Sequence, residues 1–565
     1  MRSFTRWLPA LLAATAFALA TGCAQLPKNV ERPVSGALAS PAGTPLAALV
    51  QQRHDAAGAR YDSGFLLLDG PQNAYGSRLA LVEGARKTLD LQYYAIHADA
   101  STRRLMTAVR EAADRGVRVR ILIDDFHSTG RDALVLQLAY DKNIEVRLFN
   151  PLAGARGSSL GRLFNSIGDV SRIQQRMHNK LFLADNVLGV TGGRNLGDAY
   201  FGIGQSGNFV DIDVLAAGPI VQDLSRSFDS YWNNERAFPV QSLLSREELD
   251  GIREKARAAS AASRATAEGP RPSDARRAVV WDEQPLDLRK AEFVWAPAVV
   301  LADKPGKIAA DGSEAPSAPG TMVSQSADAQ PPAGAATHRR LTSFEAAADS
   351  TVGSDTLVEG LLQLIGLAQR DLLIISPYFV PGADMMQAFA SARTRGVRVR
   401  VLTNSLASND APIAHVGYAR HREALLKLGI ELYEMRSEQA GIGSALGSSG
   451  ASVTGESRAM LHSKVLVLDG RLLVVGSMNL DLRSQLQNTE VAVLVGSRRL
   501  AGTATEVIET TLRDGAWHVE LVDGRLTWRA PQGSALKDTT TEPDASIGLQ
   551  LMLKLFGPLA PDSML

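Results

Sequence analysis

The chain has 565 residues but one cysteine, no excess of either charge and no long apolar run beyond its N-terminus. The single cysteine excludes an internal disulfide and any cysteine-based metal site. Lysine plus arginine and aspartate plus glutamate both number 60, so the chain lacks the basic excess that is typical of nucleic-acid binders. No stretch of about 18 uninterrupted apolar residues predicts a membrane span. The histidines show no HExxH or similar ligand spacing, so we predict no metal and no cofactor.

The N-terminus has the pattern of an export signal. Arg2 and Arg6 precede an apolar run over residues 8–20, which is too short to span a bilayer comfortably. Small residues then lead into Cys23, which resembles the lipobox of a bacterial lipoprotein. We therefore predict a signal peptide over residues 1–22, acyl chains on Cys23 and a periplasm-facing protein anchored to the inner or outer membrane. The alternative interpretation is a secretory signal with an incidental cysteine.

The chain repeats itself. The string Arg-Gly-Val-Arg-Val-Arg at 115–120 recurs at 395–400, an offset of 280 residues, and a His-x-Lys string recurs at an offset of 284. A nearly constant offset over such a span indicates duplication of one domain. We place the two copies at residues 63–245 and 345–530, with a tether over 23–62 before them.

Composition sets the remaining boundaries. Residues 246–344 form the predicted linker, within which 309–340 are rich in Ala, Pro, Ser and Gly and are predicted to be a disordered insertion. The tail, 531–565, ends in an apolar stretch for which two interpretations stay open: a helix lying on a membrane surface, or a helix docked on the core.

Each copy alternates strand and helix patterns. Residues 117–124 and 397–402 are dense in β-branched residues, as expected for buried strands, and helical periodicity covers 104–113 and 360–369. This alternation predicts an α/β fold in which each domain is a mixed β-sheet flanked by helices. Duplication predicts that the two domains are related by pseudo-twofold symmetry.

A longer motif surrounds each His-x-Lys string, and its spacing is the same in both copies. One isolated His-x-Lys would be weak evidence, but two copies in matched repeats are specific. The residues are His178, Lys180, Asp185, Gly192, Gly193 and Asn195 in the first copy, and His462, Lys464, Asp469, Gly476, Ser477 and Asn479 in the second.

The spacing predicts a hairpin in each copy. Histidine and lysine two residues apart point to one face of a strand. Asp185-Asn186 and Asp469-Gly470 are favourable two-residue turns, so Asp185 and Asp469 are predicted to have structural roles. Such turns would pair His178 with Gly193 and His462 with Ser477, which brings the asparagine of each motif back beside its histidine.

Two such half-sites suit phosphodiester transfer. One histidine can attack phosphorus while the other donates a proton to the leaving alkoxide. The cationic Lys180 and Lys464, with the amides of Asn195 and Asn479, can bind the nonbridging oxygens, and no metal is then required.

The motifs resemble the HKD motifs of the phospholipase D superfamily. The strings at 376–382 and 403–410 resemble bacterial cardiolipin synthases, and residues 192–201 resemble their C-type subgroup. The resemblance implies a two-step phosphatidyl transfer in which His178 is the nucleophile and His462 the acid; because the half-sites are related by pseudo-symmetry, the exchanged assignment stays open. It implies membrane phospholipids as partners: phosphatidylglycerol or phosphatidylethanolamine as donor, and phosphatidylglycerol as acceptor. Both half-sites lie in one chain, so no dimer is required.

Further residues are candidates for supporting roles. Glu490, and Asp211 as its counterpart in the first copy, are predicted to orient the imidazoles; an acid that begins a strand can equally be an ion-pair residue. The family match favours a substrate pocket formed by Tyr378, His415, Tyr418 and Arg422, although the last three also have the spacing of a packed helix face.

Three other functions stay open at this stage. The same residues would serve a phospholipase that lets water take the phosphatidyl group, and only the product separates the two. A metal-independent nuclease of the superfamily is disfavoured by the neutral charge and the predicted envelope address. A lipid-binding lipoprotein without activity is disfavoured by the intact motifs.

Overall fold

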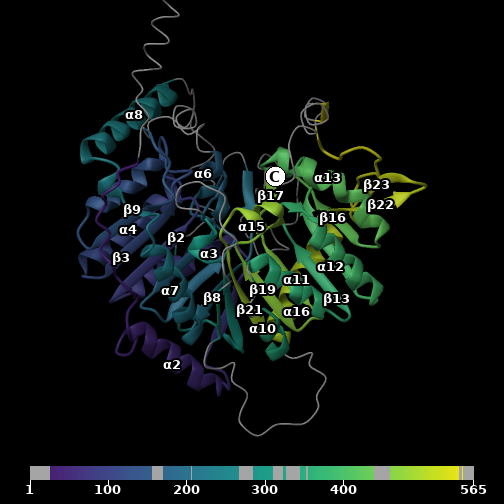
Figure 1. The fold of residues 1–565 in the computed structure, drawn as a ribbon, viewed down its shortest axis with the longest axis horizontal. Helices are drawn as coiled ribbons and strands as arrows, with labels where there is room; N and C mark the ends of the chain where they lie inside the picture. Colours follow the sequence, from purple (N-terminus) through teal and green to yellow (C-terminus); the bar gives the residue numbers. More distant parts are fainter. Residues whose placement is uncertain are drawn as a thin grey trace, which may run out of the picture.

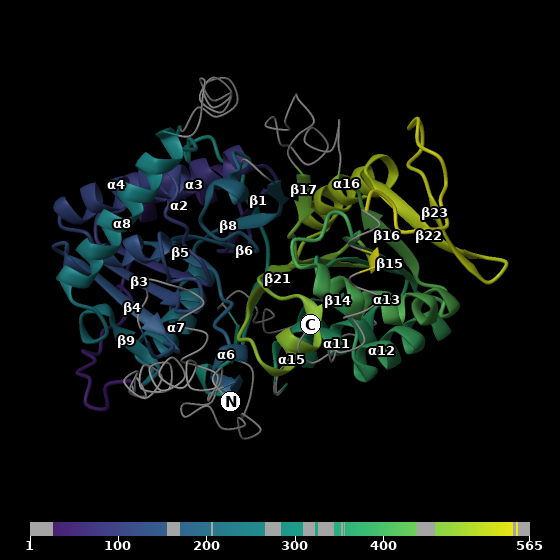
Figure 2. The same cartoon turned by 90° about the horizontal axis from the view of Figure 1, so that it is seen from above.

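The computed structural model describes residues 26–154, 170–204, 207–265, 284–308, 322–325, 344–351, 354, 356–437, 458–545 and 550–551. Two α/β halves lie side by side, the first in purple to teal and the second in green to yellow (Figures 1 and 2). The predicted signal peptide with Cys23, and most of the apolar tail, lie outside the described residues. Among the described residues, no helix combines the length and apolarity needed to cross a bilayer.

The first half contains a sheet of nine strands in the order β10-β1-β8-β6-β5-β2-β3-β4-β9. Strands β2, β3 and β4 run parallel, and the others join antiparallel, which makes the sheet mixed. The bounds are β1 Gly64–Leu68, β2 Thr88–Tyr93, β3 Arg118–Asp124, β4 Ile144–Phe149, β5 Leu181–Ala184, β6 Leu188–Gly192, β8 Asp213–Ala217, β9 Ala237–Pro239 and β10 Val294–Trp295.

The second half repeats this order in a sheet of ten strands, β12-β11-β21-β19-β18-β13-β15-β16-β22-β23. Eight consecutive strands have a counterpart in the first sheet, so the predicted fold class and duplication are confirmed. The bounds are β11 Ala298–Ala302, β12 Met322–Gln325, β13 Asp371–Ile375, β15 Arg398–Asn404, β16 Glu431–Met435, β18 Val465–Leu468, β19 Leu472–Gly476, β21 Val491–Gly496, β22 Ala516–Val522 and β23 Arg525–Arg529.

The predicted linker is more structured than its composition suggests. Strand β10 pairs with β1 of the first sheet, and β11 pairs with β21 of the second. Since β11 is the counterpart of β1, the second sheet takes its first strand from within 246–344, and the predicted boundary at 345 is too late. Strand β12 pairs with β11 inside 309–340, so a wholly disordered insertion is also wrong. The other residues of that insertion lie outside the described ranges.

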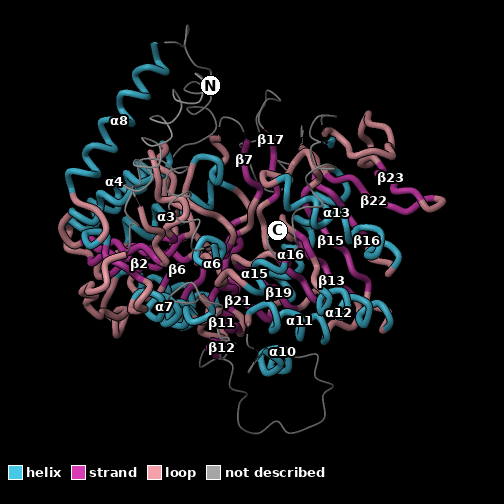
Figure 3. The backbone as a smooth tube through the Cα atoms, turned by 45° about the horizontal axis from the view of Figure 1, so that its top comes forward, coloured by secondary structure: helices cyan, strands magenta, loops and turns pink. Residues whose placement is uncertain are grey.

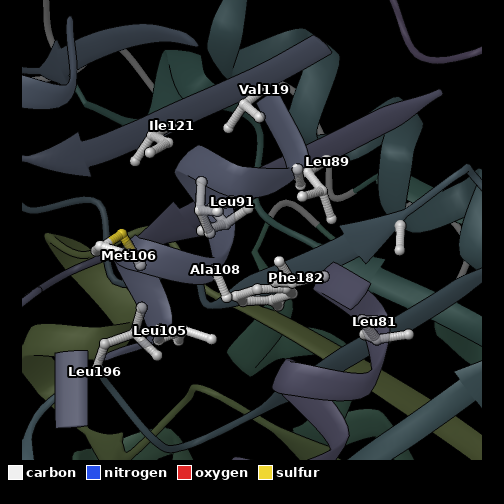
Figure 4. Close-up of a cluster of buried hydrophobic side chains, with 14 of the residues drawn as sticks. Leu81, Leu89, Leu91, Leu105, Met106, Ala108, Val119, Ile121, Phe182 and Leu196 are labelled. Carbon is white, nitrogen blue, oxygen red and sulfur yellow. The ribbon is translucent and has the colours of Figure 1, made fainter. Parts of the chain in front are cut away.

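Helices cover both faces of each sheet. In the first half α2, α3, α4 and the 3₁₀ helix η2 share one apolar cluster with β2 and β3, part of which is drawn in Figure 4. Helices α10 to α13 cover the corresponding face of the second sheet. The bounds are α2 Pro45–Ala57, α3 Pro71–Gly84, α4 Ala100–Asp114, η2 Asp132–Tyr140, α10 Phe344–Thr351, α11 Leu357–Leu367, α12 Ala383–Thr394 and α13 Pro412–Lys427.

A third apolar cluster joins the halves. It combines α7 Pro219–Trp232 and α16 Arg498–Asp514 with the inward-facing residues of both sheets, so the two domains share a core. The remaining elements are α6 Val170–Gln174, η3 Asp198–Phe201, β7 Gly207–Val210, η4 Val240–Ser242, α8 Arg246–Ala265, η5 Pro305–Lys307, β14 Phe379–Val380, β17 Arg458–Leu461, β20 Leu480–Asp481 and α15 Leu482–Leu486.

The repeated Arg-Gly-Val string marks the same turn in both halves. Gly116 follows α4 and Gly396 follows α12, with φ of 94° and 83°. Each glycine amide donates to a carbonyl of the last helical turn, as in the glycine ending of many helices. The chain then enters β3 or β15 directly, which explains why this string kept its sequence in both copies.

Candidate active site

Each motif forms a hairpin, but its register differs from the prediction by one residue. Ala184 pairs with Leu188 and Leu468 with Leu472, so three residues separate the paired ends instead of two. The turn residues Asp185 and Asp469 have the expected positive φ, 48° and 53°. The predicted pairings of His178 with Gly193 and of His462 with Ser477 are therefore wrong, because the residue after each turn adds one position.

The histidines and lysines also precede the strands on which they were predicted. Strand β5 begins at Leu181 and β18 at Val465. Lys180 Nζ donates to the His178 carbonyl at 2.7 Å, and Lys464 Nζ to the His462 carbonyl at 2.6 Å. All four side chains are buried.

The motif aspartates contact the main chain at the far end of each hairpin. Asp185 accepts from the backbone N–H groups of Arg86, Lys87 and Thr88 at 3.0, 2.7 and 2.9 Å. Asp469 accepts from those of residues 369–371 at 3.1, 2.8 and 3.0 Å. Each carboxylate thus ties a turn to the chain entering β2 or β13, and none of these hydrogen bonds involves a motif histidine.

These equivalent contacts predict unequal losses of stability. Asp185 is fully buried, whereas Asp469 is partly exposed, so water can replace only the second carboxylate. We expect Asp185→Ala to lower the free energy of unfolding by about 2–4 kcal/mol and Asp469→Ala by about 1 kcal/mol. Thermal melting of the two variants measures the difference. An Asp185→Ala protein that melts like the wild type but is inactive would instead make this residue catalytic.

The two histidines are each paired with a carboxylate of the other domain. His178 Nδ1 lies 2.9 Å from Glu490 Oε2, and His462 Nδ1 lies 2.8 Å from Asp211 Oδ2. Both carboxylates are fully buried. A carboxylate at Nδ1 fixes the ring and its tautomer, which leaves Nε2 of each histidine for the reacting group. The predicted acids therefore come together with the predicted histidines, but across the domain boundary.

Short backbone ribbons between the domains produce this exchange. Strand β7, which leads to Asp211, pairs in parallel with β17, which leads to His462, and the two lie side by side in Figure 3. His462 N–H donates to Val210 O at 2.9 Å. On the other side Met177 bridges Thr489, and His178 N–H donates to Thr489 O at 2.9 Å. Both pairs are thus set by main-chain hydrogen bonds.

The small residues of the motifs make room for these carboxylates. A Cβ on Gly193 would lie 2.5 Å from both carboxylate oxygens of Asp211. In the second half Ser477 stands at this position, and its hydroxyl donates to Glu490. Gly192 and Gly476 face residues of β8 and β21 equally closely. The motifs differ at Gly193 and Ser477, and each of these residues lies against the acid of its own half. The difference therefore goes together with the difference between Asp211 and Glu490.

The motif asparagines differ in their contacts. Asn195 accepts from Ala95 N–H at 3.2 Å and donates to the Tyr200 hydroxyl at 3.0 Å, so both ends of its amide have partners within the fold. Asn479 is buried, and its Oδ1 has no hydrogen-bond partner among the described residues. Asn479 is thus the better placed of the two to meet a ligand.

Three residues that the motif spacing did not single out support the two acids: Arg194, which lies within the first motif, and Asp303 and Lys307, which lie outside both motifs. Arg194 donates to the Asp211 carbonyl and lies 3.4 Å from Asp213. Glu490 N–H donates to Asp303 at 3.0 Å, and Lys307 Nζ lies 2.8 Å from the same Asp303 oxygen. Asp303 and Lys307 belong to the predicted linker. Their spacing of four residues on a turn directly after a strand was the available signal.

Burial governs the electrostatics of the site. It lowers the pKa of His178 well below its ordinary value, and the nearby Lys180, Lys464 and His462 add to the effect. Burial also lowers the pKa of His462, against the hydrogen bond to Asp211. Burial raises the pKa of Glu490 to about 7. For Asp211, burial is outweighed by the His462 hydrogen bond, so its pKa lies below the usual range.

The lysine of the first motif predicts a pH dependence. Burial lowers the pKa of Lys180 to about 7, so this ammonium loses its charge as the pH rises through neutrality. We expect kcat/KM, which reports the free enzyme, to fall above about pH 7. Lys180→Arg keeps the charge, so its alkaline limb should move upward even if its maximum is lower. An alkaline limb that stays at the same pH in Lys180→Arg would assign it to another group.

The four predicted pocket residues fall into two groups, of which Tyr378 lies near the site. Burial raises the pKa of Tyr378, and Asp410, Tyr200 and Tyr94 add to the effect; Tyr200 and Tyr94 flank His462 and His178. Tyr378 donates to Asp410 at 2.8 Å. Tyr418 donates to Glu434 at 3.0 Å, and Arg422 lies 3.0 Å from Glu434 and 2.8 Å from Glu542. His415 lies 3.4 Å from Glu542, so the last three side chains share a buried polar network with the C-terminal segment. Their role as a substrate pocket stays a prediction. Among the described residues, no group of His, Cys, Asp and Glu suits a metal ion.

Comparison with known proteins agrees with this architecture. The family described as cardiolipin synthase, PLD-like domain, matches residues 79–232 and again 361–512. Cardiolipin synthase C of Escherichia coli is 34% identical over 513 residues, which is 87% of this chain and 94% of the relative. Cardiolipin synthase A of Pseudomonas entomophila is 24% identical over 83% of this chain and 72% of its own length.

The structure of phosphatidylserine synthase from Haemophilus influenzae has the same fold. It superposes with a TM-score of 0.51 at 14% identity and covers 91% of this chain and 100% of its own. A duplicated domain with a histidine, a lysine and a carboxylate from each half defines an enzyme of the phospholipase D class. The chain belongs to the cardiolipin synthase family of PLD-like proteins and is a phosphatidyltransferase of that family.

Proposed function

We propose that this protein is a cardiolipin synthase that transfers a phosphatidyl group to phosphatidylglycerol through a phosphohistidine. The observation that carries the proposal is the pair of cross-domain contacts, His178 with Glu490 and His462 with Asp211. Two ring-oriented histidines with two buried lysines supply a nucleophile, a proton carrier and cations for phosphoryl oxygens. The similarity to cardiolipin synthase C over most of both chains supports the choice of substrate.

The first step forms the covalent intermediate. Nε2 of neutral His178 attacks phosphorus of the donor lipid, while Glu490 stabilises the positive charge that develops on the ring. The bond from phosphorus to the head-group oxygen breaks, and protonated His462 gives its Nε2 proton to that oxygen. Lys180 and Lys464 balance the charge on the nonbridging oxygens.

The second step reverses these roles with a new alcohol. His462, now neutral, takes the proton from a glycerol hydroxyl of phosphatidylglycerol, and the hydroxyl oxygen attacks phosphorus. The bond from phosphorus to His178 breaks, which releases cardiolipin and returns both histidines to their starting states. When phosphatidylglycerol is the donor, glycerol is the product of the first step.

The environments of the two histidines support this assignment of roles. The pKa of His178 lies well below its ordinary value because of burial and the nearby cations, which favours the neutral, nucleophilic ring. Burial lowers the pKa of His462 as well, but the hydrogen bond to Asp211, whose own lowered pKa keeps it ionised, opposes this effect. His462 is therefore the more readily protonated of the two histidines. A neutral nucleophile and a protonated acid are what the first step requires.

The decisive experiment identifies the products. Purified protein is mixed with vesicles of phosphatidylglycerol in EDTA, and the lipids are analysed by mass spectrometry. We expect cardiolipin and glycerol in equal amounts. Phosphatidic acid as the sole lipid product would overturn transfer in favour of hydrolysis. A second donor, phosphatidylethanolamine mixed with phosphatidylglycerol, would show by release of ethanolamine whether both lipids serve as donors.

We further propose that acyl chains on Cys23 hold the enzyme at a membrane of the bacterial envelope, facing the periplasm. The support is the pattern of the N-terminus, in which a short apolar run leads into the sole cysteine. Cys23→Ser should move the protein from the membrane fraction to the soluble fraction. Equal membrane retention of the variant would contradict the anchor.

A further inference from the structure

His97, in the loop between β2 and α4, and Asp132, the first residue of η2, form a third histidine–carboxylate pair near the active site. His97 Nδ1 lies 2.9 Å from Asp132 Oδ2, and the other oxygen of Asp132 accepts from Ala98 N–H at 2.8 Å. The arrangement repeats that of His178 and His462, in which a carboxylate holds Nδ1 and Nε2 is left for a ligand. Nothing in the two-step reaction above uses this pair.

The backbone attaches the third pair to the first motif. His97 N–H donates to Leu196 O at 2.8 Å, and Ile96 pairs with Leu196. Ala95 N–H donates to Oδ1 of the motif residue Asn195 at 3.2 Å. The position of His97 relative to the active site is therefore set by three contacts to the residues that follow the first hairpin.

Aromatic rings connect His97 with both catalytic histidines. Its ring stacks on Tyr200 with centroids 6.3 Å apart, and the rings of Tyr200 and His462 meet edge to face with centroids 5.3 Å apart. On the other side His97 lies 6.1 Å from His127, His127 lies 4.8 Å from Tyr94, and Tyr94 lies 5.1 Å from His178. One ring thus separates His97 from His462, whereas two separate it from His178.

Exposure places the third pair outside the catalytic pairs. The side chains of His97 and Asp132 are 34% and 26% exposed, against 10% for His178 and 6% for His462. Tyr200, between His97 and His462, is buried. The order from solvent inward is therefore His97, Tyr200, His462, which is the order that a head group entering on the His462 side would meet.

Among the described residues of the second half, this pair has no counterpart. Phe379 pairs with Leu480 as Ile96 pairs with Leu196, so the residue in the place of His97 is Val380. The nearby aspartate there, Asp410, is held instead by the Tyr378 hydroxyl at 2.8 Å. The two catalytic pairs are related by the pseudo-symmetry, but the residues beside them, His97 with Asp132 and Val380 with Asp410, are not. The residues on the His462 side of the phosphorus therefore differ from those on the His178 side. Such a difference is expected if the alcohol binds on the His462 side only.

We propose that the His97–Asp132 pair binds a second hydroxyl of the head-group alcohol whose first hydroxyl faces His462. The inference rests on the proposed function, in which the leaving and the incoming oxygen both lie on the His462 side. Burial acts to lower the pKa of His97, but the hydrogen bond and charge of Asp132 outweigh it and raise that pKa. With Nδ1–H donated to Asp132, Nε2–H of the protonated ring donates to a hydroxyl oxygen. Glycerol has hydroxyls for both imidazoles, whereas water or an alcohol with one hydroxyl cannot reach both. The pair therefore favours a polyol over water as acceptor of the phosphatidyl group.

The test compares acceptors in one reaction. Protein in EDTA receives phosphatidylglycerol vesicles together with deuterated glycerol or with ethanol, and mass spectrometry follows cardiolipin, deuterated phosphatidylglycerol, phosphatidylethanol and phosphatidic acid. In His97→Ala, the ratio of glycerol-derived products to phosphatidic acid should fall about tenfold, as expected from one lost hydrogen bond to a charge-assisted partner. The KM for deuterated glycerol should rise by a similar factor. The ratio of phosphatidylethanol to phosphatidic acid should be the same as in the wild type.

His518→Ala is the matched control. His518 is 35% exposed, lies 3.5 Å from Glu520 and stacks on Tyr433 at 4.6 Å, but it lies on β22, next to the edge strand β23 of the second sheet. Its removal should leave every product ratio unchanged. Asp132→Asn retains the hydrogen bond to Ala98 and removes the charge, so it should give an intermediate ratio.

Several outcomes separate the two proposals. If all products of His97→Ala fall in proportion, or if the ethanol ratio falls with the glycerol ratio, His97 has a structural or general role and the inference is wrong. If wild-type protein makes deuterated phosphatidylglycerol but no cardiolipin, the proposed lipid acceptor fails while the polyol site is still measured. Phosphatidic acid alone from the wild type in both mixtures would overturn both.

Discussion

A His462→Ala protein is expected to release one equivalent of nitrophenolate from phosphatidyl-p-nitrophenol, and a His178→Ala protein none. The nitrophenolate leaving group needs no proton, so loss of the acid His462 should leave the first step intact with this donor. Loss of the nucleophile His178 should abolish it. With phosphatidylglycerol as donor, both variants should lose about 10²- to 10⁴-fold or more in kcat, because the acid and the nucleophile are then both required.

Stopped-flow absorbance measures the burst, and mass spectrometry of a proteolytic digest locates the phosphatidyl group. The adduct in His462→Ala should lie on the peptide that contains His178. A burst from His178→Ala with an adduct on His462 would exchange the two roles. The absence of a burst and of an adduct in wild type and both variants would contradict a covalent mechanism.

Removing the charge of Asp211 or of Glu490 should show which histidine each carboxylate serves. Asp211→Asn and Glu490→Gln are each expected to lower kcat with phosphatidylglycerol by about 10²- to 10⁴-fold, because an amide at Nδ1 disfavours the productive tautomer and the imidazolium. The nitrophenyl donor should restore the first step in Asp211→Asn, since that acid serves His462. It should not restore Glu490→Gln, since that acid serves the nucleophile.

The opposite pattern would mean that each acid serves the histidine of its own half. Asp141→Asn provides a control, because Asp141 is a surface residue whose partner is Arg110 at 2.6 Å. Circular dichroism and thermal melting of all three variants separate a loss of chemistry from a loss of fold. A variant that melts like the wild type and follows the predicted donor pattern supports the cross-domain arrangement.

Local spacing was sufficient to predict the hairpins and the residues of the site. Histidine, lysine, aspartate and asparagine recur at one spacing because each copy builds the same two strands and turn. The register was wrong by one residue because positive φ at Asp185 or Asp469 fits a two-residue turn, whereas the following residue, Val187 or Arg471, adds a position. That choice depends on neighbouring strands and not on the turn sequence.

The partners across the domains could not be predicted from spacing. Glu490 lies 312 residues from His178, and the contact exists only once Thr489 pairs with Met177. Asp303 and Lys307 could not be predicted for a related reason, since a short strand in the predicted linker becomes recognisable only when its partner β21 is known. Asp185 and Asp469, the aspartates of the HKD motifs, accept hydrogen bonds from backbone amides. These contacts fit the structural role predicted from the turn pattern.

A segment of two residues, 296–297, connects the two sheets. Strand β10 ends at Trp295 and β11 begins at Ala298. Ala296 N–H donates to Ser63 O of the first half, and Pro297 O accepts from Gly496 N–H of the second. This connection is too short and too well hydrogen-bonded to act as a hinge, so we expect the two halves to move as one rigid body during turnover. No binding energy is then used to close the two halves around the substrate. The phosphate of the phospholipid must instead enter a site whose shape is already fixed in the folded protein.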